Sequence, residues 1–246
     1  MRVLHSSIFS IGEDSRSKGQ GPSSAAPWAD EKGMINMTKK QRAAFCVAAL
    51  EKEYPDALCS LVASNPLELL IATRLSAQCT DERVNKVTPA LFSRYPTLES
   101  YCEADEKDIE KIIFSCGFYR QKASDIKGLA IKIRDEFDGK VPDSIEKLTS
   151  LPGIGRKTAN LIMGDVYGQP AIVADTHLIR ITNLLGLVST KDPKKVELEL
   201  KKIIAPEKSN DFCHRAVLHG RAVCVARKPQ CDKCCMAEFC RFAAKK

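Results

Sequence analysis

The sequence predicts an all-α fold. From Thr38 onward, apolar residues recur every three or four positions, which is the spacing of one buried helix face. No stretch alternates apolar and polar residues for long enough to indicate a half-buried β-strand. Short polar connections containing Gly, Pro, Asn or Asp separate the periodic segments, and the chain has no internal repeat.

Residues 1–36 differ in composition from the rest of the chain. They are rich in Ser, Gly, Pro and Ala and show no helical or strand period, so we expect them to be disordered. Glu13 and Asp14 argue against a mitochondrial presequence, and the apolar run is too short for a secretory signal. Met34 and Met37 are alternative starts of the chain.

Start and stop signals place several helices. Asn65 is a predicted N-cap followed by Pro66 at the first helical position, and Asp105 is the expected start of another helix. A longer helical pattern stops at Asp138 and Gly139, because glycine readily ends a helix. Asp143 is expected to open a further short helix, and Asp175 another. The expected apolar faces comprise Leu67, Leu70, Ile71, Leu75; Ile109, Ile112, Ile113; Ile126, Leu129, Ala130, Ile133, Phe137; and Leu178, Ile181, Leu184, Leu185.

The segment Leu151-Pro-Gly-Ile-Gly-Arg-Lys157 predicts a tight turn between two short helices. Gly153 and Gly155 can both take positive φ, and their missing side chains let a phosphate approach backbone N–H groups at the next helix N-terminus. We therefore expect Gly153, Ile154 and Gly155 to contact DNA, although ordinary helix corners also contain glycine turns.

Lys157 lies in the first turn of the helix that follows this hairpin. The positive end of the helix dipole and the neighbouring Arg156 both disfavour an ammonium there. A partly neutral amine beside bound DNA can attack C1′ of a nucleotide and form a Schiff base. A lysine that only binds phosphate is the alternative, and these residues alone favour it. Asp175 is an N-cap that could also face the lysine and accept its proton, and His177 is expected to be a hydrogen-bonded residue at a helix start.

Four cysteines near the C-terminus, Cys224, Cys231, Cys234 and Cys240, are spaced C-x6-C-x2-C-x5-C. Four thiolates from one short segment can hold tetrahedral zinc or a [4Fe–4S] cluster. Zinc ribbons usually have two C-x2-C pairs, often with a histidine, whereas this segment has one pair and no histidine. The spacing favours the iron–sulfur cluster, zinc is the alternative, and Cys235 is expected to be a non-ligand.

The remaining cysteines indicate a reducing compartment. The chain lacks a secretory apolar segment, so disulfide pairing is less favoured. Most of the other cysteines lie among apolar or small residues, where a reduced thiol acts as a small hydrophobe: Cys46, Cys59, Cys79, Cys102, Cys116 and Cys213.

A formal net charge of +7 favours a polyanionic partner. The excess is concentrated in residues 220–246, where a solvated basic tail is the simple interpretation. Arg227 and Lys228, however, lie in the loop between two predicted cluster ligands. A loop held at both ends can present these charges to DNA phosphates without a large entropy cost.

Five motifs together resemble the endonuclease III family over roughly residues 37–241. They are Leu75-Ser-Ala-Gln78 with Thr80-Asp81, Cys116-Gly-Phe118-Tyr119, the segment from Leu151 to Asn160, Val173-Ala-Asp175-Thr-His177 and the four-cysteine loop. The resemblance implies a bifunctional DNA glycosylase and apurinic/apyrimidinic lyase. Such an enzyme removes oxidised pyrimidines, such as thymine glycol, in base excision repair.

The resemblance also implies two all-α domains. A six-helix barrel with the helix-hairpin-helix would span residues 59–169. A second domain, from residues 37–58 and 170–246, would hold the [4Fe–4S] cluster. The expected partner is double-stranded DNA with damaged pyrimidines or abasic sites. We expect the protein to be a monomer that has no membrane partner. We also expect it to lie in the bacterial cytoplasm, associated with the nucleoid. Residues 1–36 lie outside the resemblance.

By motif, Lys157 would be the nucleophile and Asp175 its acidic partner. Gln78 would fill the space left by the extruded nucleotide, and Phe118, where the family often has an aliphatic residue, would insert into the base stack. The simpler alternatives are a polar helix-end residue for Gln78 and a core residue beside Tyr119 for Phe118.

The residues alone leave two other functions open. An adenine-specific mismatch glycosylase belongs to the same superfamily, but the amine of Lys157 and the absence of an appended C-terminal domain count against it. A non-catalytic iron–sulfur protein that binds DNA or transfers electrons would leave the presence of both Lys157 and Asp175 unexplained.

Overall fold

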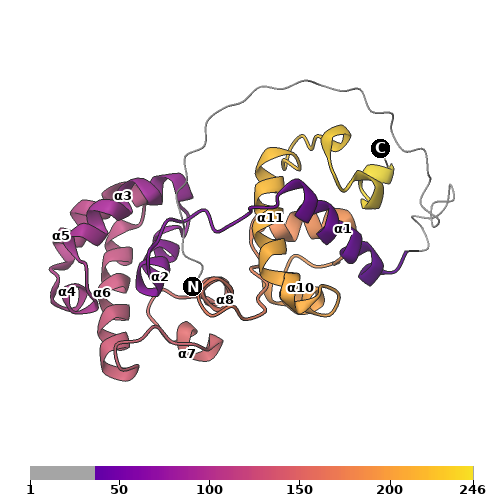
Figure 1. Cartoon of the computed structure of the whole chain (residues 1–246). Helices are drawn as coiled ribbons and strands as arrows, with labels where there is room; N and C mark the ends of the chain where they lie inside the picture. Colours follow the sequence, from indigo (N-terminus) through magenta and orange to yellow (C-terminus); the bar gives the residue numbers. More distant parts are fainter. Residues whose placement is uncertain (1–36, 246) are drawn as a thin grey trace, which may run out of the picture. The chain divides into compact units, whose positions relative to one another are not determined.

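The computed structural model describes residues 37–245. These residues contain α-helices and 3-10 turns but no β-strand, which confirms the predicted all-α class (Figure 1). The described residues from Thr38 onward form one compact unit. The predicted disorder of residues 1–36 concerns residues outside the described range.

Eleven α-helices make up most of the described chain. They are α1 (Lys39–Glu53), α2 (Pro66–Leu75), α3 (Asp81–Arg94), α4 (Leu98–Glu103), α5 (Glu106–Ile113), α6 (Tyr119–Glu136), α7 (Ile145–Thr149), α8 (Arg156–Asp165), α9 (Thr176–Leu185), α10 (Pro193–Lys201) and α11 (Ser209–Ala222). The 3-10 turns are η1 (Phe114–Cys116), η2 (Pro206–Lys208), η3 (Cys231–Lys233), η4 (Ala237–Phe239) and η5 (Ala243–Lys245).

Side-chain caps explain where many of these helices begin. Asn65 accepts a hydrogen bond from the Glu68 N–H, 3.0 Å away, at the start of α2, and Asp105 caps α5. The prediction for α7 was wrong by one residue. Ser144 rather than Asp143 accepts the Lys147 N–H, because the helix begins at Ile145.

The end of α6 also follows its predicted signal. Asp138 and Gly139 both have positive φ, 50° and 70°, and the Gly139 N–H donates to the Ile133 carbonyl at 3.1 Å. The Ile133 carbonyl also accepts the Phe137 N–H at 3.2 Å, and this left-handed termination adds a second bond that closes the last turn of the helix. The stop at these two residues is confirmed.

Buried side chains form one continuous core cluster through the described chain. α6 packs against α4 and α5 (Figure 1), and α2 packs against α3, α6 and α8. α11 packs against α1 and α9, and it also contacts α8. The division into residues 59–169 and residues 37–58 with 170–246 stays a prediction. No helix in the described range has the length and apolar character needed to cross a membrane.

Candidate active site

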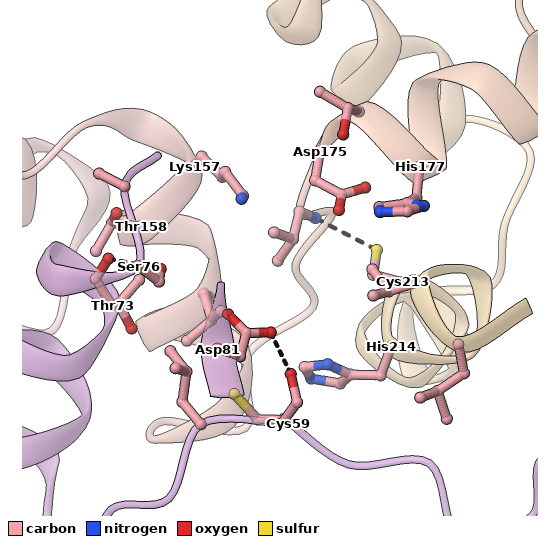
Figure 2. A pocket seen from close by; sticks show the side chains of 18 of the residues that line it. Cys59, Thr73, Ser76, Asp81, Lys157, Thr158, Asp175, His177, Cys213 and His214 are labelled. Atoms are coloured by element: carbon pink, nitrogen blue, oxygen red, sulfur yellow. Dashed lines mark hydrogen bonds between the residues drawn. The ribbon is translucent and has the colours of Figure 1, made fainter. Parts of the chain in front are cut away.

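A cavity of about 470 Å³ is lined by residues from α2, α8, α11 and the connections around them (Figure 2). This volume is typical of sites that bind small molecules. Its walls combine apolar side chains with a few polar groups. The charged and histidine side chains that line it are Asp81, Lys157, Asp175, His177, His214 and Arg221.

Lys157 and Asp175 approach this cavity from two different helices. Lys157 is the second residue of α8, and Asp175 is the N-cap of α9, where one carboxylate oxygen accepts the Leu178 N–H at 2.7 Å. Both residues line the cavity, where the Lys157 amine points toward Asp175 and the Asp175 carboxylate is turned toward His177 (Figure 2). The other carboxylate oxygen of Asp175 is not used in the cap, so capping and an acid–base role are compatible.

Arg156 precedes Lys157 but is bound elsewhere. Its Nε and Nη2 donate to the two carboxylate oxygens of Glu197 in α10, at 2.7 and 2.9 Å. Glu197 is buried and also accepts from Lys201 and Asn160. The charge of Arg156 is thus paired with that of Glu197, and its expected effect on Lys157 stays a prediction.

Asp81 and Arg221 form an ion pair at the cavity that sequence reasoning did not identify. Arg221 Nη2 donates to Asp81 Oδ2 at 2.8 Å, and the Ser60 hydroxyl donates to the same oxygen. Burial alone would raise the pKa of Asp81, but the hydrogen bonds from Arg221 and Ser60, with the charges of Arg221 and Lys157, lower it overall. The pair lies 140 residues apart in sequence, so no local pattern could predict it.

His177 lies at the cavity where α9 and α11 approach closely. A Cβ atom on Gly220 would be only 2.7 Å from His177 Nδ1, so a glycine is required at this contact. Burial lowers the pKa of His177, and the charges of Arg180 and Arg221 lower it further, while Asp175 opposes the shift. The expected hydrogen bond is present as a long contact of 3.4 Å with Arg180.

Two of the cysteines at the cavity, Cys59 and Cys213, are unsuited to act as nucleophiles. Burial raises the pKa of Cys59 and of Cys213 to about 12, so both are neutral thiols at neutral pH. Cys213 accepts the Val173 N–H at 3.3 Å and donates to the Ser209 carbonyl. Cys213 thus helps to hold the segment leading to Asp175.

The hairpin between α7 and α8 has one glycine with positive φ. Gly153 has φ +70°, and a Cβ there would lie 2.3 Å from Arg74 Nε and 2.5 Å from Asp125 Oδ2, whose side chains form an ion pair. Gly155 is extended, with φ −94°, and is the N-cap of α8. No side chain caps this helix start, which leaves its N–H groups available for an anion.

Ile154 is placed differently from its neighbours in the hairpin. Its side chain is buried and its N–H donates to the Leu151 carbonyl at 3.2 Å. It therefore stabilises the turn, and its predicted contact with DNA stays a prediction.

Gln78 and Phe118 share a left-handed backbone conformation that is rare outside glycine. Their φ angles are +55° and +47°, and both side chains are exposed, Phe118 by 70%. The alternative that Phe118 is a core residue is therefore wrong. Such strained positions occur often at functional sites.

A buried lysine connects the two segments that carry Gln78 and Phe118. Lys122 Nζ donates to the Leu75 carbonyl at 2.8 Å and to the Cys116 carbonyl at 2.6 Å. Burial lowers its pKa. No local sequence pattern predicts this link, because the Leu75 carbonyl lies 47 residues away in the chain.

Cys224, Cys231, Cys234 and Cys240 line one small cavity, together with apolar residues such as Leu184 and Phe242. Cys235 does not line it. Among the described residues, no three His, Cys, Asp or Glu side chains converge tightly enough for a single metal ion. Four thiols around one cavity are a donor set that suits a [4Fe–4S] cluster or zinc, and the cluster stays a prediction. Arg227 and Lys228, between Cys224 and Cys231, are exposed.

Comparisons with known proteins point to one family. Residues 71–206 match the HhH-GPD superfamily base excision DNA repair protein family. Endonuclease III of Synechocystis sp. is 48% identical over 84% of this chain and 94% of that protein. Endonuclease III of Escherichia coli strain K12 is 36% identical over 80% and 93%.

The chain belongs to the endonuclease III family. Members of this family are DNA glycosylases and lyases of base excision repair, and this chain is an enzyme of that class. A solved trapped endonuclease III–DNA covalent intermediate has a TM-score of 0.80 and 43% identity, covering 85% of this chain and 99% of that one. A thermostable thymine-DNA glycosylase, at 23% identity and a TM-score of 0.75, shares the fold.

Proposed function

We propose that this endonuclease III family member excises oxidised pyrimidines of the thymine glycol type and then cleaves the DNA strand 3′ of the abasic site by β-elimination. The observation that carries the proposal is the placement of Lys157 and Asp175, which line one cavity large enough for a nucleobase, with the Lys157 amine directed toward Asp175.

The proposed reaction begins with attack of the Lys157 amine on C1′ of an extruded nucleotide. The bond from C1′ to the base breaks, and its electron pair leaves with the base, which takes up a proton. Asp175 accepts a proton from the attacking amine and offsets positive charge that develops on the sugar. Opening of the sugar ring gives a Schiff base, and loss of a C2′ proton then expels the 3′ phosphate.

Several exposed groups would hold the DNA for this reaction. The uncapped N-terminus of α8, beside Gly153 and Gly155, would bind a phosphate. Gln78 and Phe118 would enter the base stack, where extruding a nucleotide costs a few kcal/mol. Arg227 and Lys228 would add phosphate contacts.

The four cysteines around the C-terminal cavity would hold a [4Fe–4S] cluster. When bound, the cluster would supply folding free energy to the surrounding loop, as structural metal sites do. The chain's own contribution is a ring of four thiols with an apolar surround that limits water access. We infer that the enzyme acts as a monomer in the bacterial cytoplasm, on the nucleoid.

Incubation with abasic and thymine glycol duplexes in the presence of borohydride tests the proposal. A bifunctional enzyme forms a trapped covalent adduct on both substrates. An adenine-specific mismatch glycosylase would release adenine without efficient trapping, and a non-catalytic DNA-binding protein would give neither. A panel of duplexes with different damaged bases then ranks the substrates, and absence of adduct on every lesion would refute the proposed reaction.

A further inference from the structure

His219 is buried between a tyrosine and one of the four cysteines. Its Nε2 lies 3.3 Å from Cys234 Sγ, and its Nδ1 lies 3.1 Å from the Tyr54 hydroxyl oxygen. The ring is 1% exposed, and it meets the Tyr54 ring edge-on at a centroid distance of 5.9 Å. Both ring nitrogens therefore have a single defined neighbour.

The chemistry of these neighbours determines which nitrogen carries the proton. A thiolate that binds iron can only accept a hydrogen bond, so Nε2 must then be the donor. In a neutral imidazole the other nitrogen is an acceptor, and the Tyr54 hydroxyl can donate to it. In this arrangement the Tyr54 hydroxyl donates to Nδ1, and Nε2–H donates to the Cys234 sulfur. Each of these polar groups then has a hydrogen-bond partner.

We propose that His219 is a positioning residue of the iron–sulfur site, which donates Nε2–H to the Cys234 sulfur and is fixed in that tautomer by Tyr54. The inference rests on the proposed presence of the cluster. A hydrogen bond to a ligand sulfur stabilises the more negative, reduced form of an iron–sulfur site, so it raises the reduction potential.

The same turn of α11 connects this sulfur to the active-site cavity. Gly220 follows His219, and its carbonyl accepts from Arg180, which also donates to the Cys224 carbonyl at 2.6 Å. Arg221 comes next and binds Asp81 at the cavity. His219 and Arg180 are therefore among the polar links that join the helix carrying Arg221 to the cysteine loop.

Replacement of His219 tests this role directly in the cluster-containing enzyme. In His219→Phe the ring packing is largely kept but the donor is lost. We expect the reduction potential of the cluster to fall by up to about 59 mV. For a one-electron couple, this shift corresponds to about a tenfold change in the ratio of oxidised to reduced cluster. We also expect a chelator to remove iron from this variant more readily, so that iron is retained about 10- to 100-fold more weakly than in the unchanged protein.

Three further variants separate this role from a general folding defect. His219→Gln places an amide N–H near the Nε2 position and should restore most of the potential and the retention. Tyr54→Phe should shift the potential and the iron retention in the same direction but by less. It removes the hydroxyl that fixes the tautomer of His219, while the imidazole ring stays in place. His214→Phe changes a histidine of the same helix that contacts Asp165 instead, so its potential should match that of the unchanged protein.

The potential and the iron content are measured by voltammetry and iron analysis, without any lesion. They are therefore independent of whether Lys157 performs the proposed chemistry. An unchanged potential and unchanged iron retention in both His219→Phe and Tyr54→Phe would overturn the proposal. A shift in His219→Phe that His219→Gln fails to restore would also overturn it, because the effect would then not depend on the donor.

Discussion

Arg156 and Glu197 form a two-point ion pair, with Arg156 Nε and Nη2 at 2.7 and 2.9 Å from the carboxylate oxygens. The pair fixes the first residue of α8 to α10. The next residue, Lys157, is then directed into the cavity that Asp175 also lines. Two adjacent basic residues thus have separate roles, one in holding the helix and one in facing the substrate.

Replacing Glu197 with Gln should destabilise the protein. The carboxylate is 2% exposed and binds Arg156, Lys201 and Asn160, so its loss weakens hydrogen bonds to charged groups, each worth about 1.5–3 kcal/mol. We expect a free energy of unfolding lower by about 2–4 kcal/mol at pH 7, measured by urea denaturation. Glu199→Gln, which removes a half-buried carboxylate of the same helix whose contact with Lys39 Nζ is longer, at 3.7 Å, is the control.

The effect of Glu197 should also depend on pH. Burial would raise the pKa of this carboxyl, but the bonds from Arg156 and Lys201 outweigh it and leave the pKa below its ordinary value of 4.5. The folded state thus binds a proton less readily than the unfolded state. The stability from this group is present above pH 4.5 and is lost as pH falls through the lowered pKa. The difference between the unchanged protein and Glu197→Gln should therefore shrink below pH 4.5, and a constant difference would contradict this account.

Lys157→Gln and Asp175→Asn should separate the nucleophile from its acidic partner. Lys157→Gln removes the amine, so borohydride should trap no adduct on an abasic site and no β-elimination should occur. Asp175→Asn keeps the helix cap, since asparagine is a good N-cap, but loses the proton acceptor. Its rate should fall by about 10² to 10⁴, with slow trapping retained.

Binding provides the control for these two variants. Both should retain affinity for a duplex with an abasic-site analogue, because the hairpin and the basic loop are unchanged. A trapped adduct from Lys157→Gln would identify a different amine as the nucleophile.

The predictable parts of this site are those whose signals are local. Asp175 and Asn65 were placed as caps because an N-cap depends only on residues within one turn. Asp81 and Arg221 could not be paired in advance, because their contact requires α3 and α11 to meet in the folded chain. The turn at Gly153 was predicted, but the extended conformation of Gly155 depends on where α8 begins.

Cysteine replacements should distinguish ligands from their neighbour. Cys235→Ser should keep the brown colour and equal amounts of iron and sulfide, since Cys235 does not line the cavity of the four thiols. Cys231→Ser or Cys240→Ser should lose the colour and weaken DNA binding, because the surrounding loop loses folding free energy. Stoichiometric zinc without sulfide in the purified protein would contradict the cluster.

Neutralising Arg227 and Lys228 should change how DNA binding depends on salt. Each exposed side chain is expected to contact about one phosphate, so the double glutamine variant should lower the slope of log K against log salt by roughly two. Turnover at saturating DNA should change little. An unchanged slope would place both side chains away from the DNA.

Lys122→Met should weaken recognition of the extruded nucleotide more than binding to ordinary duplex. The buried ammonium joins the Leu75 and Cys116 carbonyls, which precede Gln78 and Phe118. Methionine fills a similar space but has no hydrogen-bond donor, so both carbonyls are left unpaired. Each unpaired carbonyl costs about 1–3 kcal/mol, and this cost is partly offset because the variant no longer buries a charged group. The positive φ angles of Gln78 and Phe118 should then relax, since surrounding contacts maintain such strain.

The measurement for Lys122→Met compares affinity for an abasic-analogue duplex with affinity for undamaged duplex. We expect about a tenfold loss for the first, or about 1.4 kcal/mol, and little change for the second, because phosphate contacts dominate non-specific binding. Lys111→Met, which removes an exposed lysine of α5, should leave both affinities unchanged. Equal losses on both duplexes would show that Lys122 supports the fold in general, and no loss on either would show that the two loops hold their shape without it.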